Sequence, residues 1–252
     1  MRLSYSTLTI LLGLSSMSAI AAQDNVFQHE ASLGYEANSE ELGDGIWEAK
    51  YRYFASPVSQ DGSPYALNSF MAQTSNLGIN YTTFDVEDRD NMGIDGTYVF
   101  DSKWFVGLNY QRNEIGNFDF DTYGVEVGYY LNDHSSISAF YDDGDDSVEE
   151  SYGLKVRSFV AFESTSGMDL GASWLHTDSD NAFNLDVDWY INNSWSIGAG
   201  YVNSDLYDGD FDIRTAYWLR ISDSISANFA VSKVLDSDAD GLGLAIAING
   251  RF

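Results

Sequence analysis

Cysteine is absent from the chain, and proline, basic residues and long apolar runs are scarce. Without cysteine there are no disulfides, and metal sites built on thiolates are excluded. No stretch after residue 22 approaches the run of about twenty apolar residues that a transmembrane helix needs. The 252 residues include 12 Lys and Arg against 39 Asp and Glu, a formal charge of −27. So negative a chain repels nucleic acid, and we expect no nucleic-acid partner.

The first residues have the pattern of a signal peptide. Arg2 precedes an apolar run from Leu8 to Leu14, and small residues follow up to Ala22. This run is too short to span a bilayer as a helix. We therefore predict that residues 1–22 are a signal peptide for export to the periplasm and that residues 23–252 form one domain.

A period of two runs through the rest of the chain. In residues 242–252, Leu, Ile and Phe occupy one parity while Gly, Ala and Asn occupy the other, and residues 104–111, 123–131, 183–189 and 195–201 repeat the pattern. Alternation of this kind predicts antiparallel strands with one apolar face. A soluble sandwich or a lipocalin-like barrel also alternates, so the period does not by itself identify the surroundings of that face.

Aromatic spacing and glycine placement favour a membrane barrel. On the apolar parity, rings recur six residues apart, which is about 20 Å along a strand and suits the two edges of an apolar band about 25 Å tall. Glycine on the polar parity leaves room in a wet interior. We predict aromatic girdles from Trp47, Tyr53, Trp104, Tyr110, Tyr123, Tyr129, Trp189, Trp195, Tyr201 and Tyr217.

The connections alternate between tight turns and longer acidic loops, the latter at residues 38–45, 85–91, 113–121, 142–150 and 236–241. This is the pattern of an all-β, up-and-down transmembrane barrel with short periplasmic turns and longer extracellular loops. We count about fourteen antiparallel strands, with twelve or sixteen if one hairpin is misjudged. The predicted location is the outer membrane of a Gram-negative bacterium.

Residues 55–74 interrupt this rhythm. They stand where a tight periplasmic turn is expected, yet they include both prolines of the chain, Pro57 and Pro64. The stretch after Pro64 is compatible with a short helix. Two placements remain open: a constriction folded into the lumen mouth, or a periplasmic flap packed beneath the rim.

The stretch from Ser63 to Met71 and the terminal Phe252 resemble the small general bacterial porins of marine gammaproteobacteria. Over essentially the whole mature chain, this resemblance implies a barrel that carries small solutes. It also implies that Phe252 is the assembly signal read by the outer-membrane folding machinery.

The polar parity supplies candidate pore-lining charges. They are Glu48, Lys50, Arg52, Glu126, Lys155, Arg157, Asp169, Asp186, Asp188 and Arg214. Basic groups facing acidic groups would set up a transverse field, as in general porins, which favours polar solutes over apolar ones. The alternative is that these charges pair and fill a plugged interior.

No catalytic grouping emerges, and we expect no enzyme, no cofactor and no metal site. We place His29, His134 and His176 on three separate parts of the barrel, and no nucleotide or zinc motif occurs. The acidic run from Asp236 begins like a calcium loop, but its twelfth position is Ala247 instead of a bidentate acid.

These observations predict an outer-membrane porin for small hydrophilic solutes or ions, with a weak preference for cations. A non-conducting barrel that serves as adhesin, receptor or structural protein is the alternative. Expected partners are outer-membrane lipid and lipopolysaccharide, bridged to the acidic loops by divalent cations, and the assembly machinery. The sequence leaves a homo-oligomer open.

Overall fold

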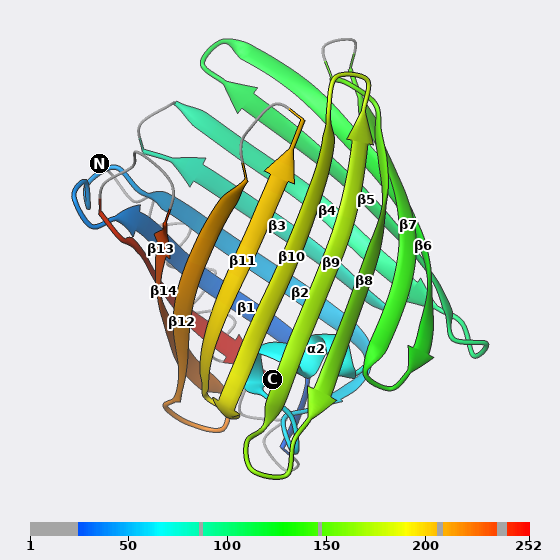
Figure 1. The fold of residues 1–252 in the computed structure, drawn as a ribbon, viewed down its shortest axis with the longest axis vertical. Helices are drawn as coiled ribbons and strands as arrows, with labels where there is room; N and C mark the ends of the chain where they lie inside the picture. Colours follow the sequence, from blue (N-terminus) through cyan, green and yellow to red (C-terminus); the bar gives the residue numbers. More distant parts are fainter. Residues whose placement is uncertain (1–24, 86–87, 146–147, 206–208, 236–240) are drawn as a thin grey trace.

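The computed structural model describes residues 25–85, 88–145, 148–205, 209–235 and 241–252. Fourteen antiparallel strands form one closed barrel in which each strand pairs with its neighbours in the chain and β1 pairs with β14 (Figure 1). The predicted fold class and the count of fourteen strands are confirmed. The predicted signal peptide, residues 1–22, lies outside the described residues.

The strands are long enough to cross a bilayer at a tilt. In the first half they are β1 (Val26–Asn38), β2 (Ile46–Ser59), β3 (Asn76–Phe84), β4 (Arg89–Val99), β5 (Trp104–Ile115), β6 (Phe118–Asn132) and β7 (Ser135–Gly144). In the second half they are β8 (Ser151–Ala161), β9 (Gly167–Thr177), β10 (Asn181–Asn192), β11 (Trp195–Ser204), β12 (Asp210–Arg220), β13 (Ile225–Val234) and β14 (Gly243–Arg251). No described helix is long and apolar enough to cross a membrane.

We call the end of the barrel that holds both ends of the described chain the turn end, and the opposite end the loop end. The barrel closes at the turn end through Phe252. Its backbone N–H donates to the carbonyl of His29 (2.9 Å), and its carbonyl accepts from the N–H groups of Gln28 and His29. The rings of Phe252 and His29 are stacked with centroids 5.4 Å apart. Closure gives each described strand a neighbour on both sides along most of its length.

Burial is inverted relative to a soluble protein. Large apolar side chains on the outward parity are open, with Leu108 63% and Ile248 51% exposed, while Asp169 and Arg251 inside are only 8% and 5% exposed. Soluble monomers rarely present so continuous an apolar surface. The outer face of this barrel is therefore suited to hydrocarbon and its interior to water.

The strand register aligns the outward aromatic residues from neighbouring strands. Trp104 is opposite Tyr129 near the turn end, whereas Tyr110 is opposite Tyr123 six residues further along the same two strands. The same register pairs Trp195 with Tyr217 and Tyr201 with Phe211 on β11 and β12. Most of the predicted girdle side chains are at least 36% exposed, while Trp47, Tyr129 and Tyr201 are partly covered.

The prediction of a long loop at residues 113–121 is wrong. β5 and β6 pair as far as Ile115 opposite Phe118, so Gly116 and Asn117 alone connect them. Gly116 adopts a positive φ of 60°, which a tight turn requires and glycine permits. Arg112 forms ion pairs with the nearby Asp119 and Asp121, and these contacts offset the acidic charge that suggested a loop.

The predicted start of the insertion at residue 55 is also wrong, because β2 continues to Ser59. β2 pairs with β3 only as far as Phe54 opposite Asn76, but it pairs again with β1 at Val58 and Ser59. Pro57 is tolerated because this part of β2 has a neighbour on one side only. An irregular register between Phe27 and His29 accompanies the extension, and Phe27 packs inside against Phe54 and Val58.

The orientation of the two faces is testable with spin labels, because the wild-type chain has no cysteine to interfere. We expect labels at Leu108→Cys and Val187→Cys to contact lipid, with high collision rates for oxygen. Labels at the inward positions Asn109→Cys and Ser173→Cys should collide with a water-soluble nickel reagent. Electron paramagnetic resonance in liposomes measures both, and an aqueous environment at Leu108 and Val187 would contradict the assignment of the faces.

Candidate functional site

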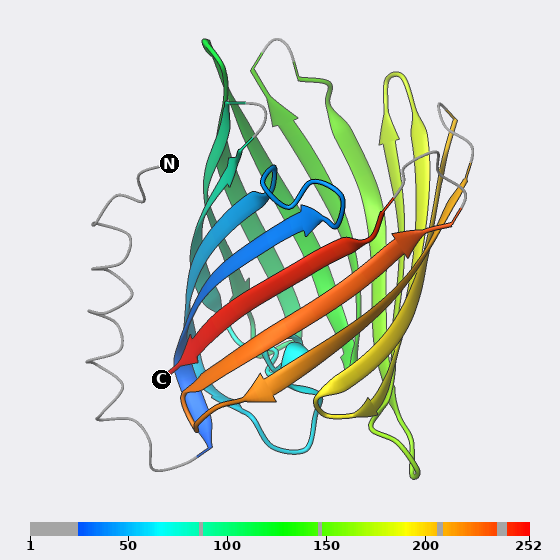
Figure 2. The same ribbon diagram turned by 90° about the vertical axis from the view of Figure 1, so that its left-hand side faces the viewer.

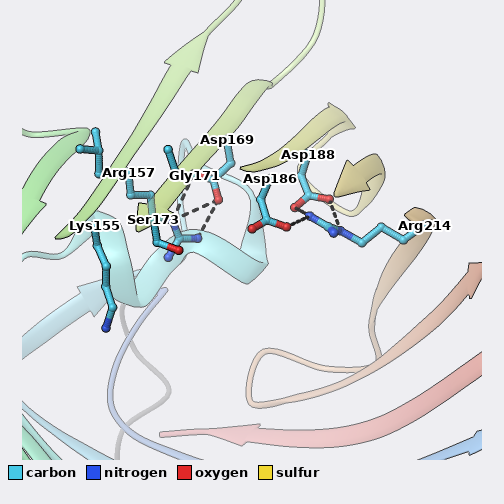
Figure 3. Close-up of a pocket in the computed structure, with 10 residues that line it drawn as sticks. Lys155, Arg157, Asp169, Gly171, Ser173, Asp186, Asp188 and Arg214 are labelled. Carbon is cyan, nitrogen blue, oxygen red and sulfur yellow. Dashed lines mark hydrogen bonds and ion pairs between the residues drawn. The ribbon is translucent and has the colours of Figure 1, made fainter. Parts of the chain in front are cut away.

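Charged side chains from β8 to β12 gather on the inner face of the barrel. Lys155, Arg157, Asp169, Asp186, Asp188 and Arg214 line a cavity of about 350 Å³ together with Gly171 and Ser173. Figure 3 shows these side chains projecting from separate strands into one space. We call the six charged residues, with Asp212, the ion-pair wall.

Two arginines hold the ion-pair wall together. Nε of Arg157 donates to both carboxylate oxygens of Asp169, and Nη2 donates to Oδ2 at 2.7 Å. Nε and Nη2 of Arg214 bind the two oxygens of Asp188, each at 3.0 Å. Nη2 also reaches Asp186, and Nη1 reaches Asp212 at 3.1 Å. Two-pronged pairing of this kind fixes the orientation of each guanidinium.

Glycine on a middle strand allows partners two strands apart to meet. Gly198 on β11 lies opposite Asp188 on β10 and Arg214 on β12. A Cβ at residue 198 would overlap Oδ1 of Asp188 and would lie 2.9 Å from the carbonyl oxygen of Val187. Gly78 on β3 has the same relation to Arg52 and Asp95, with a Cβ 2.9 Å from both side chains. Inward glycine thus makes room for the Asp188–Arg214 and Arg52–Asp95 ion pairs, each of which bridges three strands.

The other predicted lining residues also lie in ion pairs. Nη2 of Arg52 is 2.7 Å from Oδ2 of Asp95, and Nζ of Lys50 is 2.7 Å from Oε2 of Glu48. Nζ of Lys155 is 3.6 Å from Oε2 of Glu126. The structure therefore brings the ten predicted side chains together in separate groups, on β2 to β4 and on β6 to β12.

Negative charge is in excess near the ion-pair wall. Three cations, Lys155, Arg157 and Arg214, face five carboxylates, which are Glu126, Asp169, Asp186, Asp188 and Asp212. In a confined interior such an imbalance attracts mobile cations more strongly than it would in open water. This part of the inner face therefore carries a net negative charge.

The segment between β2 and β3 folds inside the barrel near the turn end, as both views show (Figures 1 and 2). It contains a 3-10 helix, Tyr65–Leu67, followed by one turn of α-helix, α2 (Asn68–Met71). We call residues 60–75 the plug. Of the two placements that the sequence left open, the structure has the one in the lumen mouth.

Arg251 on β14 is the main anchor of the plug. Its Nε donates to Oε1 of Glu30 on β1 at 2.8 Å, its Nη1 donates to Oδ1 of Asn68, and its Nη2 donates to the carbonyl of Tyr65. The guanidinium also lies over the rings of Phe27 and Trp218, 4.7 and 4.6 Å from their centroids. One buried arginine thus joins the plug to the strands at the barrel closure.

The plug contacts the opposite wall through apolar and aromatic side chains. Leu67 is buried in a cluster with Phe159 on β8 and Tyr190 on β10. The guanidinium of Arg157 lies 4.4 Å from the ring centroid of Phe70, so this arginine serves both the ion-pair wall and the plug. Because the plug reaches both sides of the barrel, it narrows the interior at the turn end.

Several of these residues were missed by sequence reasoning. Arg251 lies two residues after Asn249, so both point inward on β14. Asp95 and Asp212 point inward on β4 and β12. Strict alternation would have identified Arg251, Asp95 and Asp212 as inward. Asn68 carried no such signal, because its role depends on where the plug folds.

The histidines and acidic clusters form neither a metal site nor a catalytic grouping among the described residues. No described group of three or more His, Cys, Asp or Glu side chains is arranged to hold a metal ion. His29 lies on β1, and its Nδ1 is 2.7 Å from the hydroxyl of Tyr51 on β2. His134 lies in the turn between β6 and β7, and His176 lies on β9. Residues 236–240 of the acidic run that resembles a calcium loop lie outside the described residues.

A closed antiparallel barrel with an apolar outer face and a polar, ion-paired interior defines an outer-membrane β-barrel of the porin class. The model of the family "Putative general bacterial porin" matches residues 2–154. The chain belongs to this family, and its place is the outer membrane of a Gram-negative bacterium. The resemblance inferred from the sequence is confirmed at the level of the family.

Solved structures support the same fold. The outer membrane protein Omp33 of Acinetobacter baumannii superimposes with a TM-score of 0.68 at 20% identity, over 91% of this chain and 100% of that one. A structure described as a bacterial polysaccharide outer membrane secretin gives 0.51 at 12% identity, over 89% and 98% of the chains. A triple mutant of the Rh. blastica porin gives 0.50 at 11% identity with the same coverage. A search of curated proteins found no match.

The bridging role of Gly198 predicts a position-specific effect. Gly198→Ala should separate Asp188 from Arg214 and destabilise the barrel by about 1–3 kcal/mol through overpacking. Gly171→Ala is the matched control in the same cavity, because its Cβ would meet Asp186 at an ordinary 3.5 Å. Urea unfolding in liposomes measures both variants, and equal stability of the two would contradict the bridging role.

The anchoring role of Arg251 predicts a larger effect. Arg251→Met should lower the free energy of unfolding by about 3 kcal/mol or more, because it leaves the Glu30 carboxylate without its cation and Oδ1 of Asn68 without its donor. Arg112→Gln, at an exposed ion pair near the loop end, should leave the unfolding midpoint nearly unchanged. The same urea titration compares them, and a midpoint for Arg251→Met that matches wild type would contradict the role as anchor.

Proposed function

We propose that the protein is a diffusion porin that passes small hydrophilic solutes or ions and weakly prefers cations. The observation that carries this proposal is the ion-pair wall with the neighbouring Glu126, where five carboxylates face three cations inside a barrel whose outer face is apolar. Fixed charge of both signs orders water and favours polar solutes, and the negative excess favours cations. In this proposal the ten predicted charges line the aqueous pathway.

The plug sets an upper limit on solute size in this proposal. It lies inside the barrel near the turn end (Figure 2), and its Phe70 contacts Arg157 of the ion-pair wall. A solute entering from the loop end would first meet the charges of the wall and then pass the plug. Selection by charge therefore comes before selection by size.

The orientation and partners belong to the same proposal. The outward aromatic pairs would lie at the two membrane interfaces, with the turn end periplasmic after export directed by residues 1–22. Acidic loop-end residues would approach lipopolysaccharide phosphates only through divalent cations, because like charges repel. Phe252 would be the residue that the assembly machinery reads, and a homo-oligomer remains compatible with the outer face.

The second candidate is a non-conducting barrel that acts as adhesin, receptor or structural protein. The observation that favours it is the extent of the plug, which contacts walls on opposite sides of the lumen. Conductance separates the two candidates, because a sealed barrel passes no current.

Purified protein in planar bilayers should give discrete conductance steps, and its reversal potential in a salt gradient should have the sign of a cation preference. Asp186→Asn should move the reversal potential toward zero, because it removes one negative charge while Asp188 and Asp212 continue to hold Arg214. Ser173→Ala, in the same cavity, should not change it. Absence of current from correctly folded wild-type protein would exclude the porin function.

A further inference from the structure

The contacts of the plug are unevenly distributed around the barrel. Besides its contacts with β1, β8, β10 and β14, the plug forms hydrogen bonds with residues at the turns of the barrel. The N–H of Tyr65 donates to the carbonyl of Asn193 between β10 and β11 (3.0 Å), and Nε2 of Gln73 donates to the carbonyl of Asn132 at the end of β6. Arg220 on β12 lies over the ring of Tyr65, and Ala72 packs against the Phe27, Phe54 and Val58 cluster.

The remaining arc, toward β4 and β5, contains a cavity of about 320 Å³ at the turn end. Its lining includes Ser56, Gln73, Thr74, Val99, Lys103 and Tyr130. Ser75 is the final residue of the plug, and its Oγ accepts a hydrogen bond from the N–H of Val99 on β4 (2.9 Å). The cavity therefore lies between the last residues of the plug and the wall of the barrel.

This cavity is suited to water and small polar solutes. Hydroxyl and amide groups of Ser56, Gln73 and Thr74 border it, and Nζ of Lys103 lies 3.6 Å from Oδ1 of Asp133, which offsets its charge. At about 30 Å³ of liquid volume per water, the space holds on the order of ten waters. The lining also includes Asp101, so polar groups and charges of both signs border the space.

Tyr130 is held in place at the border of this cavity. Its ring packs against that of Phe105 with centroids 4.8 Å apart. Phe105 fits there because residue 128 is glycine. A Cβ at that position would lie 2.6 Å from Cε1 of the Phe105 ring. A fixed aromatic ring at the border gives the opening a defined width.

We infer that the turn-end opening of the pathway lies off the barrel axis, between plug residues 73–75 and the wall formed by Val99, Lys103 and Tyr130. This inference rests on the proposed porin function and specifies where its solutes leave the barrel. The plug is then a fixed partition that directs solutes to one side. Small hydrated solutes, ions included, are the class that this opening admits, with Tyr130 and Gln73 setting its width.

The absence of cysteine permits a direct test. Thr74→Cys and Val99→Cys, each as the only cysteine in the full chain, place a thiol at the inferred opening. A cationic methanethiosulfonate reagent added to both sides of a planar bilayer should reduce the conductance of each by a factor of about two or more, because it narrows the passage. Thr74 lies outside the strands, so its substitution leaves the barrel ladder intact.

Ser226→Cys is the matched control. Ser226 is inward on β13 near the same end of the barrel and is only 5% exposed, on the arc to which the plug is attached. The reagent should leave its conductance unchanged. Mass spectrometry of the treated protein establishes which thiols have reacted.

The possible results separate the inference from the function on which it rests. Conductance that persists after complete modification of Thr74→Cys and Val99→Cys, or thiols there that do not react at all, would overturn the off-axis opening. Block of Ser226→Cys alone would move the opening to the opposite arc and overturn it as well. A wild-type protein that folds but never conducts would refute the proposed function itself.

Discussion

Closure of the backbone hydrogen-bond ladder between β1 and β14 is the constraint on which the rest of this structure depends. Once the sheet is closed, every strand has two neighbours and each side chain must point either to the lumen or away from it. The alternating sequence then assigns Leu, Ile, Val and aromatic rings to the outside. It assigns Gly, Ser, Asp and Arg to the inside, where they meet one another across strands.

The interior shows how a polar lumen is kept ordered. Long charged side chains on alternate strands meet over a glycine on the strand between them, as Asp188 and Arg214 do over Gly198. The carboxylates of the ion-pair wall are paired with Arg157 or Arg214, which limits unpaired charge in a confined space. Negative charge nevertheless remains in excess on this part of the inner face.

The plug connects the closure of the barrel to the shape of the lumen. Arg251, the residue before the terminal Phe252, bonds both to Glu30 on the first strand and to Asn68 and Tyr65 of the plug. Phe252 closes the outer side of the same junction against His29. The strands that seal the barrel therefore also position the segment that narrows it, so a change at this junction affects both.

Much of the fold was predictable from the sequence, because the same alternation of apolar and polar residues recurs from strand to strand. The errors lie where local composition and pairing disagree. Acidic residues at 113–121 suggested a loop, but cross-strand pairing continues to Ile115 and Phe118. Pro57 suggested the end of a strand, but β2 continues along β1 to Ser59.

For the candidate site, parity identified ten inward charges but not their partners. Which carboxylate pairs with which arginine depends on the register between strands, and register is a property of the closed sheet.

The sequence by itself determined the barrel class and a count of about fourteen strands, and its glycine and aromatic placement indicated the parity that faces the lumen, because these follow from a pattern that recurs along the chain. Only the tertiary structure decided the register of the ion-pair wall, the position of the plug and the role of Arg251. These depend on contacts between residues far apart in the chain, such as Glu30 with Arg251 and Leu67 with Phe159. No local pattern encodes such contacts, since they exist only after the first and last strands have met.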